Sequence, residues 1–149
     1  MTITSSTVAN DISSNDATIA LTFTVTGTNK KTKTFGAGDI TVDNGLISNF
    51  ATTNADGLGY ATIFTATFTP TGEGVCTIDV GAGAFADIEG DDNTAASQFE
   101  WTYDATPPTM TITSGDVNSG DTSSDATIAL TFTSSEDTTT FDENDITVT

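Results

Sequence analysis

The chain has 149 residues, of which 36% are hydrophobic, so it can bury the core of one domain and part of a second. It carries 21 acidic residues, three lysines and no arginine or histidine, which gives a formal net charge of −18. This charge repels phosphate and anionic lipid, and therefore excludes nucleic-acid binding and disfavours binding to a membrane surface. No segment reaches the roughly 20 apolar residues of a membrane span, so membrane insertion is excluded too. The N-terminus carries no secretion signal, so a signal for export would lie outside this chain.

Along the first two thirds of the chain, apolar and polar residues alternate, which is the pattern of half-buried strands. Residues 17–26 show it most clearly, with Ile19, Leu21 and Phe23 on one face and threonines on the other. The alternation predicts strands, in chain order, at residues 1–5, 17–26, 39–42, 46–52, 60–69, 76–80 and 98–103. Turn residues such as Asn-Gly at 44–45 separate them.

About seven strands in roughly 105 residues, without a convincing helix, predict an all-β fold. The expected architecture is an antiparallel, immunoglobulin-like β-sandwich, complete within residues 1–105. The single cysteine, Cys76, is in phase with its apolar neighbours and is expected to be buried. Trp101 is likewise expected in the core.

An internal repeat determines the domain organisation. Residues 1–24 and 110–133 are identical at 16 of 24 positions, and the segment Asp-Ala-Thr-Ile-Ala-Leu-Thr-Phe-Thr at 16–24 recurs unchanged at 125–133. The first copy then carries three extra residues before Phe35, which corresponds to Phe141. Each copy is therefore expected to form the same sandwich in tandem.

The second copy stops after its first strands. Residues 106–109 contain two prolines and are expected to form a stiff, extended linker. Residues 110–149 hold only the first part of a sandwich, which cannot bury its apolar face by itself. We expect another segment or another chain to complete it, as in strand addition.

Four motifs carry a resemblance to a known family: Asp-Ile-Thr-Val at 39–42, Phe-Thr-Ala-Thr-Phe-Thr-Pro-Thr at 64–71, Ala-Gly-Ala-Phe-Ala-Asp at 82–87 and Phe-Glu-Trp-Thr-Tyr-Asp at 99–104. Together they resemble the bacterial Ig-like repeats of secreted giant adhesins and surface fibre proteins, over residues 1–109 and the start of the second copy. The resemblance implies an extracellular or cell-surface location and a spacer or adhesive role without catalysis. It also implies calcium at domain junctions.

The boundary between the copies is the first candidate calcium site, because calcium takes several oxygen ligands. In such a sandwich, the loop after the second strand faces the preceding copy. Asp104 is therefore expected to meet Glu136 and Asp137 of the following copy, with Asp11 and Asp16 approaching from the other side. The alternative is that these carboxylates only keep a long fibre soluble.

A second candidate calcium site is the acidic loop of residues 87–93. Its potential ligands are Asp87, Glu89, Asp91, Asp92 and Asn93. The first three lie two residues apart around a glycine, which suits a metal-binding turn, although the spacing of an EF-hand is missing. A solvated acidic loop is the alternative.

All three lysines, Lys30, Lys31 and Lys33, lie in one loop of the first copy. We expect this loop to contact another subunit, with ammonium groups facing the acidic end of a preceding copy in place of a divalent ion; a solvated loop is the alternative. The family that this chain resembles has an acidic residue after the second strand. The second copy keeps it, in Ser-Ser-Glu at 134–136, whereas the first copy has the lysine loop there instead.

The sequence argues against an enzyme, because it offers no histidine as a base for a serine or threonine nucleophile and no phosphate-binding glycine loop. Two functions remain. One is a structural repeat of an extracellular filament or rod, whose partners are copies of itself; the other is an adhesin module that binds carbohydrate or a host surface. Nearly every aromatic residue is in phase with a core face, which favours the structural role. The 34 threonines and 12 serines also offer sites for O-linked glycan.

Overall fold

The computed structural model describes residues 1–148 and divides the chain into two compact units, Met1–Ala105 and Thr106–Thr149. The first unit contains a short 3-10 helix, η1 (Ala37–Asp39), and eight strands. In chain order the strands are β1 (Thr2–Ser5), β2 (Ser13–Ser14), β3 (Ile19–Thr24), β4 (Thr41–Asp43), β5 (Gly45–Thr52), β6 (Ile63–Pro70), β7 (Gly74–Asp79) and β8 (Phe99–Tyr103). None of the helices in residues 1–148 is long and apolar enough to cross a membrane.

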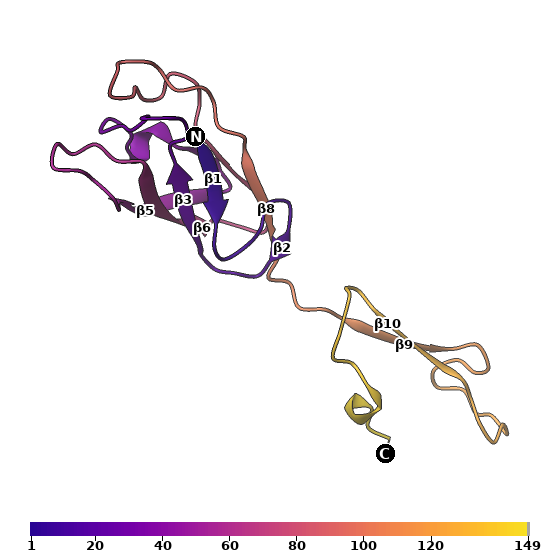
Figure 1. Cartoon of the computed structure of the whole chain (residues 1–149). Helices are drawn as coiled ribbons and strands as arrows, with labels where there is room; N and C mark the ends of the chain where they lie inside the picture. The colour runs from indigo at the N-terminus through magenta and orange to yellow at the C-terminus, as the bar shows by residue number, and fades with distance from the viewer. Residues whose placement is uncertain (149) are drawn as a thin grey trace. The chain divides into compact units, whose positions relative to one another are not determined.

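Two four-stranded sheets form the first unit, with the strand orders β1-β3-β6-β5 and β2-β8-β7-β4 (Figure 1). All pairs within them are antiparallel except β2–β8, which is parallel. The predicted immunoglobulin-like sandwich is therefore confirmed, and each of the seven expected strands is present within a few residues of its expected bounds. The eighth strand, β2, is only two residues long, too short for alternation to reveal it.

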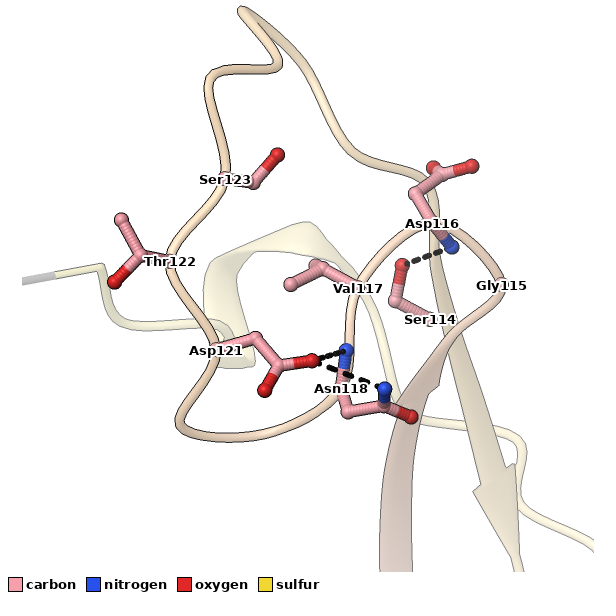
Figure 2. A pocket seen from close by; sticks show the side chains of 8 residues that line it. All are labelled: Ser114, Gly115, Asp116, Val117, Asn118, Asp121, Thr122 and Ser123. Carbon is pink, nitrogen blue, oxygen red and sulfur yellow. Dashed lines mark hydrogen bonds between the residues drawn. The ribbon is translucent and has the colours of Figure 1, made fainter.

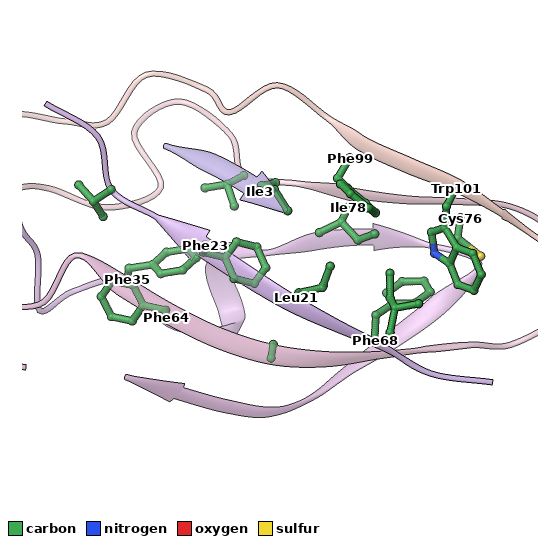
Figure 3. Packing of buried hydrophobic residues seen from close by; sticks show 14 of the residues in the cluster. Ile3, Leu21, Phe23, Phe35, Phe64, Phe68, Cys76, Ile78, Phe99 and Trp101 are labelled. Carbon is green, nitrogen blue, oxygen red and sulfur yellow. The ribbon is translucent and has the colours of Figure 1, made fainter. Parts of the chain in front are cut away.

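The core lies between the two sheets (Figure 3). From the first sheet, Phe23 and Phe68 are fully buried, and from the second, Cys76 and Trp101 are fully buried at directly opposed positions of β7 and β8. Burial of each of these two phenylalanine side chains stabilises the fold by about 1.5–3 kcal/mol, because it removes their apolar surface from water. The expected burial of Cys76 and Trp101 is confirmed.

Strand β5 is less regular than its sequence indicates. Its pairing with β6 shifts between Ser48 and Ala51, and Asn49 adopts a φ of 51°, so the strand contains a bulge. At its start, a Cβ on Gly45 would lie 2.0 Å from the ring of Phe68. Only glycine lets the backbone approach that ring so closely. Gly45 is therefore required for packing as well as for the turn.

The second unit repeats the first strands of the first unit. Its strands are β9 (Met110–Ser114) and β10 (Leu130–Ser134), followed by the 3-10 helix η2 (Glu143–Asp145). Ile112 pairs with Phe132 as Ile3 pairs with Phe23. The similarity extends to the loop before β10, where Gly120 has a φ of 88° at the position at which Asp11 has 63°.

The aromatic contacts behind these strands repeat as well. Phe132 lies 5.4 Å from Phe141 between ring centroids, and the equivalent rings of Phe23 and Phe35 lie 5.5 Å apart. The same sequence has therefore formed the same local structure twice.

The two copies differ in burial. Leu21 is 1% exposed in the first copy, whereas the equivalent Leu130 is 49% exposed. Ile3 and Ile112 show the same contrast, at 9% and 60%. In the first unit, β6 covers the open edge of β3, whereas the described part of the second unit forms a two-stranded sheet. The strand pair of the second unit therefore has an apolar face that no other strand of residues 110–148 covers.

Candidate cation site

Three carboxylates converge in the loop that follows β7. Oδ1 of Asp87 accepts hydrogen bonds from the backbone N–H groups of Glu89 at 2.8 Å and Asp91 at 3.0 Å. Gly90, with a φ of 90°, lets the chain turn back so that the N–H of Asp87 can donate to the carbonyl of Asp91. As a result, oxygens of Asp87, Glu89 and Asp91 lie within 4.8 Å of one another.

The ammonium group of Lys30 contacts all three of these carboxylates. Its Nζ lies 2.5 Å from Asp87 Oδ2, 2.7 Å from Glu89 Oε2 and 3.1 Å from Asp91 Oδ2. The side chain of Asp87 is 7% exposed, whereas those of Glu89 and Asp91 are 61% and 72% exposed. Lys30 and Asp87 therefore form the less exposed centre of the cluster, and the carboxylates of Glu89 and Asp91 form its solvent-exposed edge.

These contacts favour the charged form of both central groups. The pKa of Lys30 is raised, first by its hydrogen bond to Asp87 and then by those to Glu89 and Asp91. The pKa of Asp87 is lowered, first by the hydrogen bond from Lys30, against an opposing effect of burial. The cluster thus already contains a cation, provided by the chain itself.

A second turn of the same design lies between β5 and β6. Oδ1 of Asp56 accepts hydrogen bonds from two backbone N–H groups of its turn, at 2.9 and 3.0 Å, and Gly59 has a φ of 83°. Lys31 Nζ contacts Asp56 Oδ2, and this hydrogen bond lowers the pKa of Asp56. Lys33 Nζ lies 4.8 Å from the centroid of the Tyr60 ring, a cation–π distance.

Backbone and hydroxyl contacts fix the lysine loop between these two turns. Thr32 is fully buried; its N–H donates to the carbonyl of Ala61 at 2.9 Å and its hydroxyl donates to the carbonyl of Ala86 at 2.6 Å. Ile88 donates to the carbonyl of Lys31 at 2.9 Å. Each of the three lysines thus has partners within the first unit, and the subunit contact expected for them remains a prediction.

The other two residues of the expected calcium loop have different positions. Asn93 has a structural role: its side chain accepts from the N–H of Phe85 at 2.9 Å and donates to the carbonyl of Gly81 at 2.7 Å. Asp92 forms an isolated bridge with Ala86, and its carboxylate does not belong to the converging group found in residues 1–148. Calcium at this loop remains a prediction, and an ion at the three carboxylates would have to displace the Lys30 ammonium.

The expected junction ligands of the first unit separate into two places. Oδ2 of Asp16 accepts from the hydroxyl of Ser14, and the N–H of Asp104 donates to the carbonyl of Ser14 at 3.1 Å, so both acidic residues lie at the end of the sandwich where β3 begins. Asp11 instead donates its N–H to the carbonyl of Glu100, about 13 Å back along β8 at the usual rise of a strand. Glu136 and Asp137 lie in the second unit.

Figure 2 shows a polar hollow in the loop between β9 and β10. Asp121 accepts hydrogen bonds from the N–H and the side-chain amide of Asn118, at 3.3 and 3.0 Å. Asp116 accepts from the N–H of Ala129 at 2.7 Å, next to the start of β10. These carboxylates are held by donors of their own loop and serve to shape it.

Sequence reasoning missed Asp56 and Tyr60 as partners of the lysines. The sequence does contain a signal for the two turns, because the spacing Asp-x-x-Gly occurs at 56–59 and again at 87–90. The first turn binds Lys31 and the second binds Lys30. The partner of each lysine nonetheless depends on the packing of three loops far apart in sequence, which spacing alone does not give.

Comparison with known proteins agrees with this architecture. A family model described as "Bacterial Ig-like domain" matches residues 1–103. No curated protein and no solved structure matches the chain. The match covers more than half of the chain and coincides with the first sandwich. The chain therefore belongs to the bacterial Ig-like domain family.

Proposed function

We propose that this chain is a structural repeat of an extracellular filament or rod-like surface protein, built from Ig-like domains that follow one another head to tail. The observation that carries the proposal is the repetition of one strand pair in one register, Ile3 with Phe23 and Ile112 with Phe132. A tandem array of sandwiches gives length and stiffness. Domains of this family are typically non-catalytic surface or structural modules, which is consistent with such a role.

The placement of the aromatic side chains supports a structural role over sugar binding. All aromatic residues of the first unit are buried or half-buried, including Trp101 in the core and Tyr60 beneath Lys33. Carbohydrate sites usually present an aromatic face to solvent, and the described residues of the first unit present none of that kind.

The open face of the second unit supports completion by further strands. Its exposed apolar residues, Ile112, Leu130 and Phe141, correspond to residues that β6 and the second sheet cover in the first unit. We propose that strands of the β5–β8 type, from another segment or another chain, complete this repeat. Calcium bound at the acidic ends would stiffen the array further.

Electron microscopy of the native material, labelled with an antibody raised against residues 1–105, tests this function. We expect the antibody to decorate extended rods or filaments outside the cell, at a spacing of one domain or a small multiple of it. Labelling confined to the cell interior, or specific binding of the purified chain to a glycan array, would contradict the proposal.

A further inference from the structure

The chain contains two N-terminal halves of a sandwich and one C-terminal half. Residues 1–42 and residues 110–148 are the N-terminal halves, because both form the same strand pair and the same 3-10 helix. The C-terminal half, residues 45–103, contributes β5 to β8. Only one of the two N-terminal halves can occupy it at a time.

Hydrophobic packing distinguishes the two candidates at only one position, where the buried Val25 corresponds to Ser134. The strands β1 and β3 recur without a single change as residues 111–114 and 128–133. Every core residue that they contribute, from Ile3 to Phe23, is the same in the second copy, and Phe35 recurs as Phe141. Apart from the change of Val25 to Ser134, an exchange of halves would therefore preserve the packing of the core, the situation that favours domain swapping.

The charges do distinguish the two halves. Counted back from Phe35 and from Phe141, Lys30 corresponds to Glu136 and Lys31 corresponds to Asp137. The partners of both lysines, Asp87 and Asp56, belong to the C-terminal half. If residues 110–148 occupied that half, two carboxylates would replace two ammonium groups in front of four carboxylates.

We propose that Lys30 and Lys31, by facing Asp87 and Asp56, select the N-terminal half that pairs with residues 45–103 and reject the half at residues 110–148. The rejection is strongest at Asp87, because its side chain is 7% exposed and hydrogen-bonded to its own turn, and so cannot move away into solvent. Like charges placed together at an interface disfavour the wrong partner more than attraction favours the right one. This inference extends the proposed spacer role without depending on it.

Cross-strand disulfides report which half is in place. Thr22 lies opposite Thr65 in the β3–β6 pair, and Thr131 is the equivalent of Thr22. In a Cys76→Ala background, Thr22→Cys with Thr65→Cys reports the native pairing. Thr131→Cys with Thr65→Cys reports the exchanged pairing, within one chain or between two, which a non-reducing gel separates.

The decisive variant reverses charge in the second copy only, so the first unit is left intact. In the exchanged-pairing reporter, Glu136→Lys with Asp137→Lys should raise the disulfide fraction in a glutathione buffer by about tenfold, the effect of roughly one like-charge contact. The control, Ser124→Lys with Thr127→Lys and Glu143→Lys, makes the same change in net charge at positions equivalent to the exposed Asn15, Thr18 and Ala37 and should leave the fraction unchanged.

Two further measurements complete the test. First, Lys30→Gln should raise the fraction of the exchanged disulfide and lower the fraction of the native one. Second, 1 M salt should raise the fraction of the exchanged disulfide in the reporter without further changes, because salt screens the charges beyond about 3 Å. The proposal is overturned if the double reversal leaves the exchanged disulfide unchanged, or if the unchanged sequence already forms both disulfides equally. Either result would leave the electron-microscopy test of the spacer role unaffected.

Discussion

Lys30 is the residue whose environment differs most from that of an ordinary surface lysine. Its ammonium contacts three carboxylates, and only one of them, Asp87, is sheltered from solvent. Exposed ion pairs contribute little to stability, because water and salt screen them. The contribution of this cluster therefore resides mainly in the Lys30–Asp87 contact, which holds the lysine loop against the turn that precedes β8.

This contact predicts a pH dependence. Lys30→Gln should lower the free energy of unfolding at neutral pH, measured in urea by the fluorescence of Trp101, the single tryptophan. The pKa of Asp87 is lower in the folded state, so its contribution is complete above the ordinary value of 3.8 and is lost as the pH falls through the lowered pKa. The pKa of Lys30 is raised, so its contribution is complete below 10.5 and is lost as the pH rises through the raised pKa.

The quantity to plot is the difference in unfolding free energy between the unchanged chain and Lys30→Gln, because general charge repulsion cancels in it. We expect a plateau between about pH 4 and pH 10, with a decline on each side. Lys33→Gln is the matched control, since Lys33 faces the Tyr60 ring and forms no ion pair within residues 1–148. A difference that stays constant down to pH 2 would refute the assignment.

At the scale of the strand, the repeat provides an internal comparison between a covered and an open sheet. Phe23 is fully buried between two sheets, whereas its equivalent Phe132 is only half-buried in a two-stranded sheet. Sequence and register are the same in both places, so any difference in energetic contribution comes from the strands that cover β3 and do not cover β10.

Phe23→Ala should lower the free energy of unfolding of the first unit by about 3–5 kcal/mol, through lost burial and the cavity that remains. In a monomeric sample, where no other chain completes the second copy, Phe132→Ala should change the unfolding curve, followed by circular dichroism, by less than about 0.5 kcal/mol. Equal costs for the two substitutions would mean that another element closes the second copy in solution.

Sequence alone was sufficient for the regular elements of this fold. Alternation revealed β3 and β6, and the repeat revealed β9 and β10, because these signals are local and periodic. The bulge at Asn49 and the two-residue strand β2 have no period and escaped detection. The site was missed for a different reason: the residues of the acidic turn were identified, but Lys30 reaches them from a loop 57 residues away in sequence, through tertiary packing.

For the whole chain, the contrast in burial predicts unequal resistance to proteolysis. Thermolysin, which cleaves before large apolar residues, should first attack the second unit, where Ile112 and Leu130 on the two-stranded sheet and Ile128 just before β10 are 40–60% exposed. The fragment that persists should end near Ala105, as mass spectrometry of a time course would show. Equal lifetimes of the two units in a monomeric sample would contradict the open face described for the second.

The two copies also record which positions of this half can vary. All eight differences between residues 1–24 and 110–133 fall within residues 6–15, and the backbone keeps its left-handed turn where Asp11 in one copy becomes Gly120 in the other. The two copies thus differ along this segment, including Ser13 of β2, while β1 and β3 keep the same register as β9 and β10. A foreign peptide grafted there would be displayed on each sandwich that carries it, so the loop is an attachment point for engineered surface arrays.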